Sequence, residues 1–258
     1  MAYFERLTST PDGGGRFRAT PHTGGGWNPA EQHIAPTVGL VAHSLQRASA
    51  GAPVQRLAVE ILGTIGIDEV EVQVATVRPG RTIELVEATV AWAGRDVVRA
   101  RAWRLAGSDT TEVAASAEPA LPAREELAPW DMSTAWPGGY IASLEVRHRD
   151  AGPGRAQAWL RARQELLDDE EVTDLTRTLL LADTANGLVQ GPGRRGWFYP
   201  NVELTVHLFR APVGAWVGMD TSVSWGPGGH GLTATVLHDE AGPVGRVSQS
   251  CTLRRGPG

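Results

Sequence analysis

Two stretches of this 258-residue chain are variants of one pattern: RPGRTIELVEATVAWAGRDVVRARAWRL at residues 78–105 and GPGGHGLTATVLHDEAGPVGRVSQSCTLRR at residues 226–255. Each contains a glycine turn, a long alternating strand, a second glycine turn and a second strand. A helix candidate precedes each stretch, at about residues 33–49 and 171–190. The sequence therefore predicts a duplicated unit in which each half of a sheet wraps its own helix.

Alternating runs around these hairpins extend the pattern, as in EVEVQVATV at 69–77, which is typical of a strand with one solvated face. The expected strands are 54–61, 69–77, 81–92 and 96–105, then 141–149, 156–166, 202–209, 215–225, 231–238 and 244–254. This order predicts an α+β fold with two long helices, each wrapped by half of a continuous antiparallel β-sheet. We expect a first repeat at 1–110, a connector at 111–140 held on the sheet by Trp130 and Trp136, and a second repeat at 141–258.

The bulk composition narrows the classes of function. A formal charge of −5, with acidic and basic residues interspersed, argues against nucleic acid as a partner. The single cysteine, Cys251, excludes an internal disulfide and suits a reducing compartment. Because the sequence shows neither a secretory signal nor a run long enough to span a membrane, we expect a soluble cytoplasmic protein. We also expect no metal or organic cofactor, since metal-ligand spacings and nucleotide-binding motifs are missing from the sequence.

The second helix candidate carries an aspartate where an apolar residue is expected. Its beginning, LDDEEVTDL, offers Asp168 or Asp169 as the N-cap. At roughly 100° per residue, one face collects Val172, Leu175, Leu179, Ala182, Asp183 and Asn186. Asp183 therefore points towards the core, where burial should raise its pKa. A functional carboxylate and a structural one that bonds backbone amides are equally compatible with this pattern.

Two later strands carry further polar candidates. In GRVSQSCTL, alternate residues from Val247 onward share one face, so Gln249 interrupts an apolar row and needs buried hydrogen-bond partners. In YPNVELTVHLF, one face consists of Asn201, Glu203, Thr205 and His207. The pattern alone favours structural roles, as a core amide for Gln249 and as a solvated face for the second group.

Three segments in order, LLLADTANGL, FYPNVELTVHLFRAPVGAW and DEAGPVGRVSQSCTL, resemble the acyl-CoA thioesterase family with tandem hotdog folds, the relatives of bacterial type II acyl-CoA thioesterase. GGGWNPAEQHIAPTVGLVAHSL resembles the start of the family's first hotdog helix, and VRPGRTIELVEATV resembles one of its strands. The resemblance covers nearly the whole chain and implies a double hotdog fold.

The resemblance also implies a set of site residues. In the family, an aspartate on the second helix, a serine or threonine at the start of the next strand and a glutamine on the last strand hold the attacking water. These positions fall on Asp183, Asn201 and Gln249. Asn201 departs from the family pattern, although an amide can donate to and accept from water as a hydroxyl does. Thr205 is a second candidate for the middle position, but it lies roughly 13 Å further along the strand.

The resemblance therefore implies a hydrolase that acts on an acyl-CoA or acyl-carrier-protein thioester, with backbone N–H groups near a helix end polarising the thioester oxygen. An alternative is a non-catalytic acyl-thioester or lipid-binding hotdog protein, which the Asn201 departure favours. A hotdog hydratase is a weaker option, because WNPAEQH at 27–33 lacks the aspartate of the hydratase signature and misplaces its histidine. Since hotdog sheets commonly pair edge to edge, a homodimer is a further expectation.

Overall fold

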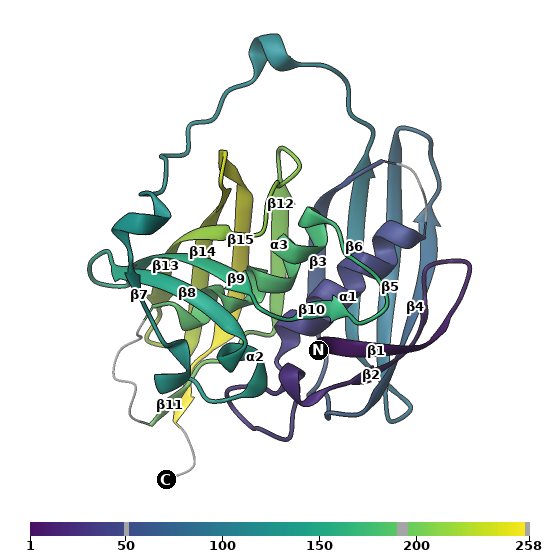
Figure 1. The fold of residues 1–258 in the computed structure, drawn as a ribbon, viewed down its shortest axis with the longest axis horizontal. Helices are drawn as coiled ribbons and strands as arrows, with labels where there is room; N and C mark the ends of the chain where they lie inside the picture. The colour runs from purple at the N-terminus through teal and green to yellow at the C-terminus, as the bar shows by residue number, and fades with distance from the viewer. Residues whose placement is uncertain (49–51, 190–195, 256–258) are drawn as a thin grey trace.

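The computed structural model describes residues 1–48, 52–189 and 196–255. Within them, one sheet of fourteen strands curves around two central helices, α1 (Ile34–Arg47) and α3 (Asp174–Ala182) (Figure 1). Its strands in spatial order are β10 (Glu165–Leu167), β1 (Ala2–Ser9), β2 (Gly15–Ala19), β4 (Glu69–Arg78), β5 (Ile83–Trp92), β6 (Arg95–Leu105), β3 (Val54–Ile61), β12 (Glu203–Leu208), β15 (Gly242–Thr252), β14 (His230–Asp239), β13 (Val217–Trp225), β9 (Arg155–Ala162), β8 (Leu144–Asp150) and β7 (Ala128–Pro129). The α+β architecture with two wrapped helices is confirmed.

The two halves of the sheet join between β3 and β12, where Ala58 pairs with Thr205. Reading outward from this seam, β3-β6-β5-β4-β2-β1 is matched by β12-β15-β14-β13-β9-β8, the same order twice. One pair departs from the expected antiparallel sheet, because the short strand β10 pairs with β1 in parallel. That strand belongs to the second half of the chain and covers the outer edge of the first, which would otherwise expose unpaired backbone groups. A separate two-stranded ribbon joins β11 (Trp197–Phe198) to β16 (Arg254–Arg255).

Both helices are shorter than predicted. The α1 helix begins after His33 and ends at Arg47, and position 49 of the prediction lies outside the described residues. The α3 helix ends at Ala182 and tightens into a 3₁₀ turn, η5 (Asp183–Gly187), while position 190 lies outside the described residues. Its DTANG sequence explains the change, because threonine, asparagine and glycine are poor formers of α-helix.

The predicted N-cap of the second helix was wrong. Thr173, and neither Asp168 nor Asp169, caps α3, with its hydroxyl accepting from the N–H of Thr176 at 3.2 Å. Asp169 instead forms an ion pair with Arg6 at 3.0 Å. The acidic residues before the helix therefore bind a cation from β1 and leave the cap to a hydroxyl.

Close contact between the two helices forms the centre of the core. A Cβ built at Gly39 of α1 would lie 2.9 Å from Cβ of Leu180 on α3, so the helices approach too closely for a larger residue. The small side chains of α1 thus accommodate α3. This packing brings the C-terminal end of α3 beside the N-terminal end of α1, where His33 and Asp183 meet.

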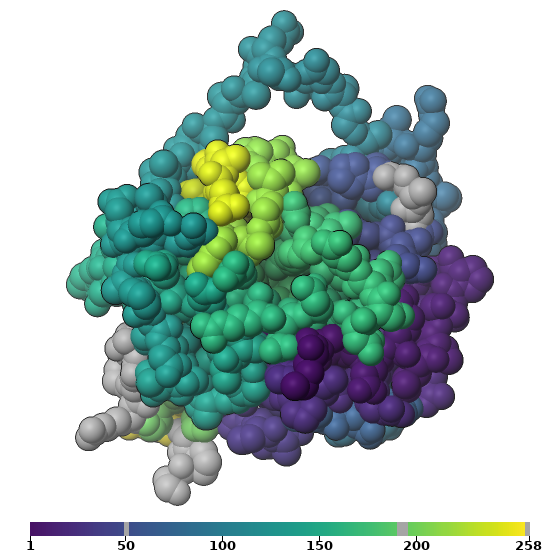
Figure 2. Space-filling view, viewed as in Figure 1, coloured from purple at the N-terminus to yellow at the C-terminus, as the bar shows by residue number. Residues whose placement is uncertain are grey.

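The connector has two parts. Residues 107–117 are exposed and arch away from the body of the protein (Figure 1; Figure 2). The later part returns to the sheet, where β7 pairs with β8 and Trp130 stacks on His148 with ring centroids 4.5 Å apart. Trp136 lies further along the connector, where its ring contacts Trp27 and Tyr199. The repeat boundaries at 110 and 140 stay predictions.

Candidate active site

The end of α3 places Asp183 inside the protein, with 2% of its surface exposed. Its Oδ1 accepts two amide hydrogen bonds, from Asn201 Nδ2 at 2.7 Å and from Gln249 Nε2 at 3.0 Å. Asn201 and Gln249, which the resemblance singled out together with Asp183, therefore both contact its carboxylate directly. Two amide donors on one carboxylate oxygen fix its orientation.

Gln249 approaches Asp183 from the sheet. It lies on β15, is fully buried and pairs with Thr233 of β14 across the ladder. Besides its bond to the carboxylate, its amide group lies 3.3 Å from the backbone carbonyl of Asp183. The amide therefore holds both the side chain and the main chain at the end of α3.

Asn201 sits just before β12, where an isolated bridge links it to Cys251 of β15. Glu203, which opens the strand, accepts a 2.6 Å hydrogen bond from the Ser250 backbone N–H and anchors this turn to β15. Thr205, the second candidate for the middle position, donates its hydroxyl to Glu203 Oε2 at 3.3 Å. Asn201, and not Thr205, thus contacts the aspartate.

His33 is a site residue that sequence reasoning missed. Its Nδ1 accepts a hydrogen bond from the Ala35 N–H at 3.1 Å, which caps α1, and lies 3.5 Å from Asp183 Oδ2. Burial lowers the pKa of His33 to about 4. The ring is therefore neutral at physiological pH, and its contact with Asp183 is not an ion pair. The sequence feature that could have identified His33 is its position directly before the first helix, where cap residues occur.

Tyr140, on the short helix α2 (Gly139–Ala142), contacts both His33 and the end of α3. Its ring stacks on His33 with centroids 4.5 Å apart. Its hydroxyl lies 2.7 Å from Thr184 Oγ1 and donates to the carbonyl of Leu180 at 3.2 Å. One buried residue thereby holds the histidine ring and the end of α3 in place.

The surroundings of Asp183 raise its pKa to about 7, chiefly because burial disfavours the charged carboxylate. The hydrogen bonds from Asn201 and Gln249 act in the opposite direction. The first turn of α1 lies close by and also favours negative charge. The result is a carboxylate that can exchange a proton near neutral pH, as a general base requires.

A cavity of about 280 Å³ opens beside these groups. Its walls include Asp183 and Asn201, whereas Gln249 does not line it. The remaining lining residues come from the segment before α1 and its first residue, from the end of β3 and the loop after it, from η5 and from the segment before β12. They are Gly25, Gly26, Trp27, Asn28, Glu31, Gln32, His33, Ile34, Ile61, Leu62, Gly63, Thr64, Ile65, Asn186 and Pro200. A molecule in this cavity can thus reach the aspartate and the asparagine directly.

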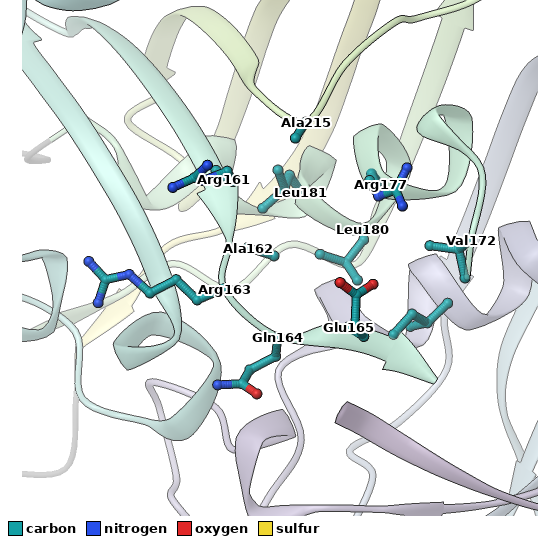
Figure 3. Close-up of a pocket in the computed structure, with 11 residues that line it drawn as sticks. Arg161, Ala162, Arg163, Gln164, Glu165, Val172, Arg177, Leu180, Leu181 and Ala215 are labelled. Atoms are coloured by element: carbon teal, nitrogen blue, oxygen red, sulfur yellow. The ribbon is translucent and has the colours of Figure 1, made fainter. Parts of the chain in front are cut away.

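A larger cavity, of about 460 Å³, lies elsewhere, between β9, β10 and α3 (Figure 3). Arg161, Arg163 and Arg177 line it together with leucine and alanine side chains and Glu165. Two of these arginines are neutralised, Arg161 by Glu145 at 2.5 Å and Arg177 by Asp174 at 2.8 Å. None of the three predicted site residues lines this cavity, so size alone does not locate the candidate site.

The duplicated first half carries no equivalent site among the described residues. A buried polar residue lies ten positions after each N-cap, His43 within α1 and Asp183 directly after α3. His43 Nε2 lies 3.6 Å from Glu170, a residue of the segment before α3. The aspartate–amide arrangement therefore belongs to the second half alone. Within the described chain, no group of three or more histidine, cysteine, aspartate or glutamate side chains could hold a metal ion.

Each half of the chain matches a protein-family model. Residues 23–105 match the acyl-CoA thioesterase N-terminal domain, and residues 119–253 match the acyl-CoA thioesterase C-terminal domain. The chain belongs to the acyl-CoA thioesterase family. This thioesterase is accordingly a thioester hydrolase. A search of curated proteins gave no match.

Solved structures confirm the fold of the thioesterase. An acyl-CoA thioesterase II, TesB2, from Mycobacterium marinum superposes with a TM-score of 0.72 at 18% identity, covering 99% of this chain and 96% of that one. A protein of Novosphingobium aromaticivorans assigned as a thioesterase superposes with a TM-score of 0.78 at 17% identity, covering 98% of this chain and 99% of that one. A hot dog fold protein from Alicyclobacillus acidocaldarius superposes with a TM-score of 0.75 at 13% identity, covering 95% of this chain and 93% of that one. The double hotdog prediction is confirmed.

Proposed function

We propose that this thioesterase hydrolyses acyl-CoA with a water molecule that Asp183 activates and Asn201 orients. One observation carries the proposal: Oδ1 of Asp183 receives both amide donors, which leaves Oδ2 as the carboxylate oxygen without an amide hydrogen bond. Since Asp183 lines the cavity and its pKa lies at about 7, this carboxylate can take a proton from water at neutral pH.

The reaction then follows from the positions of the groups. Asp183 accepts a proton as the water oxygen attacks the thioester carbonyl carbon. The tetrahedral intermediate collapses, the C–S bond breaks, and the thiolate leaves with the proton returned from Asp183. The products are a carboxylic acid and free CoA thiol.

The negative charge that develops on the carbonyl oxygen needs a nearby donor. Ile34 lines the cavity and is the first residue of α1, so its backbone N–H has no partner within the helix. The helix dipole favours negative charge at this end. We assign the polarisation of the thioester oxygen to this first turn.

The three predicted site residues have different roles in this proposal. Asp183 and Asn201 line the cavity and can touch water or substrate, whereas Gln249 acts through Asp183 as a positioning residue. The resemblance implied that the glutamine holds water, and its place behind the carboxylate favours the indirect role. The Asn201 bond to Asp183 supports a working site, so a purely binding protein is the weaker alternative.

Release of free thiol from a panel of acyl-CoA thioesters tests the proposal, with the same acyl groups on an acyl carrier protein as a second panel. The wild-type protein should hydrolyse the CoA series, and Asp183→Asn should not. Asp96→Asn is the matched control, because Asp96 lies on β6 with about half of its side chain exposed. Equal rates for wild type and Asp183→Asn would reject the assigned site.

Two further expectations belong to this proposal and rest on the sequence alone. They are a cytoplasmic location and a homodimer. Within the described residues, no helix combines the length and apolar character needed to cross a membrane.

A further inference from the structure

Four residues, Gly26, Trp27, His33 and Asn186, line both the active-site cavity and a second, much smaller hollow. The hollow measures about 30 Å³, and Trp27 is among the residues that line both spaces. The residues that line the hollow are Gly26, Trp27, His33, Met132, Trp136, Ile141, Thr184, Asn186, Gly187 and Tyr199. Of the four shared residues, Trp27 has the largest side chain, and we term its indole the partition.

Aromatic side chains hold this partition from several sides. The Trp27 ring lies 5.1 Å from Trp136, 5.0 Å from Phe198 and 5.4 Å from Tyr199, measured between centroids. Such pairs stabilise a fixed geometry beyond the area they bury. Trp136 is itself held, because its Nε1 donates to the Gly187 carbonyl at 3.0 Å.

The wall behind Trp27 has little room to move. A Cβ at Gly187 would lie 2.9 Å from Cε of Met132, and a Cβ at Gly26 would lie 3.1 Å from the Pro137 carbonyl. Packing at this density makes each added methylene group costly. An acyl chain that reaches Trp27 therefore meets an indole ring that its aromatic neighbours hold in place.

The linings of the active-site cavity and of the hollow differ in polarity. Asn28, Glu31 and Thr64 are among the polar residues that line the cavity, whereas the hollow beyond Trp27 has mainly aromatic and aliphatic walls. An apolar acyl chain gains most when it lies against the aromatic side, which directs the polar carrier towards the other. At about 280 Å³, the cavity is near the lower limit for ligand pockets.

We propose that Trp27 limits this thioesterase to short-chain acyl groups, whose end packs against the indole ring. The inference rests on the proposed function, because it places the thioester carbonyl beside Asp183. Removing the indole would join the cavity to the hollow and make room for a longer chain. Excluding one methylene group from an apolar pocket typically lowers kcat/KM by about tenfold or more.

The test measures thiol release by wild type and Trp27→Ala across a straight-chain series from acetyl-CoA to palmitoyl-CoA. Wild type should prefer butanoyl-CoA or hexanoyl-CoA and should be at least about tenfold slower on palmitoyl-CoA. Trp27→Ala should move the preference to longer chains. Since Trp27 is 40% exposed, the variant should fold, and its melting temperature checks this. Trp103→Ala is the control, because Trp103 is a half-buried tryptophan on β6 that is not among the lining residues of either space.

The outcomes separate this inference from the proposed function. A wild-type preference for long chains, or an unchanged profile in Trp27→Ala, would overturn the role of Trp27 while leaving the hydrolytic site intact. If no acyl-CoA is hydrolysed, the proposed function fails, and equilibrium binding of non-hydrolysable acyl-CoA thioethers of the same lengths decides the inference instead. Tighter binding of short than of long chains, reversed in Trp27→Ala, would support it, and equal affinities would reject it.

Discussion

Asp183 and Gln249 are 66 residues apart in the chain, yet the amide Nε2 of the glutamine donates to Oδ1 of the aspartate at 3.0 Å. Each interrupts an apolar row of its own element, and the amide supplies the buried carboxylate with a hydrogen-bond donor. The bond joins the end of α3 to β15 and leaves Oδ2 of the aspartate without an amide donor.

Asp183→Asn should abolish hydrolysis while the protein still folds. The amide keeps the side-chain volume but cannot accept a proton from water, and the loss of a general base typically costs ~10²–10⁴ in rate. Thiol release measures the rate, and circular dichroism with thermal melting measures folding. A variant that melts like wild type and keeps its rate would contradict the assigned base.

Hydrolysis by the wild-type protein should depend on pH with a midpoint near 7. The pKa of Asp183 is raised to about 7 by burial, so the carboxylate becomes available as a base only as pH rises through that value. The profile of kcat/KM for the best acyl-CoA should therefore rise between about pH 6 and pH 8. A flat profile across this range would show that another group, or none, takes the proton.

Gln249→Met should shift that midpoint to higher pH. Methionine keeps an unbranched side chain of similar size, but it removes the amide hydrogen bond that lowers the pKa of Asp183. Because the variant also leaves the carboxylate less well oriented, the maximal rate should fall. A purely structural role for Gln249 would change the melting temperature and leave the pH midpoint in place.

The stability of the protein should also report on Asp183. Its pKa is raised in the folded state, so its contribution to stability is complete below about pH 4 and is lost as pH rises through about 7. His33 acts in the opposite direction, since its pKa of about 4 lies below the ordinary value of 6.5 and its contribution is lost as pH falls through 4. Relative to wild type, Asp183→Asn should therefore gain stability from pH 4 to pH 7, as measured by urea denaturation. A constant difference between the two proteins would place the pKa near its ordinary value.

Two variants of His33 should separate its capping role from its place in the site. His33→Ala removes the acceptor for the Ala35 N–H, which should cost about 0.5–2 kcal/mol of stability. His33→Asn retains a capping oxygen and should recover most of that loss. Urea denaturation measures both. Equal destabilisation by alanine and asparagine would show that packing against Tyr140, and not the cap, is what the histidine contributes.

Much of the architecture was predictable because it follows from local patterns. The strand β3 at Val54–Ile61 matches its prediction at both ends, and alternation in Glu69–Arg78 placed β4 to within one residue. The end of the second helix was harder. Its apolar stripe continues through Asp183, but the hydroxyl of Tyr140 bonds to Leu180 and Thr184, and the chain tightens into a 3₁₀ turn there. A contact across 40 residues of chain could not be anticipated from the stripe.

The candidate site was likewise predictable only in part from local sequence patterns. Period-two alternation placed Gln249 on the inner face of its strand, and helical periodicity directed Asp183 inward, so these local patterns predicted two inward-facing polar residues. The packing of distant elements sets the rest: the two residues share a hydrogen bond, Asn201 and not Thr205 joins them, and His33 and Trp27 line the cavity beside them. The physical reason is that side-chain periodicity depends on the local backbone, whereas hydrogen bonds and cavity walls depend on how separate elements pack in space.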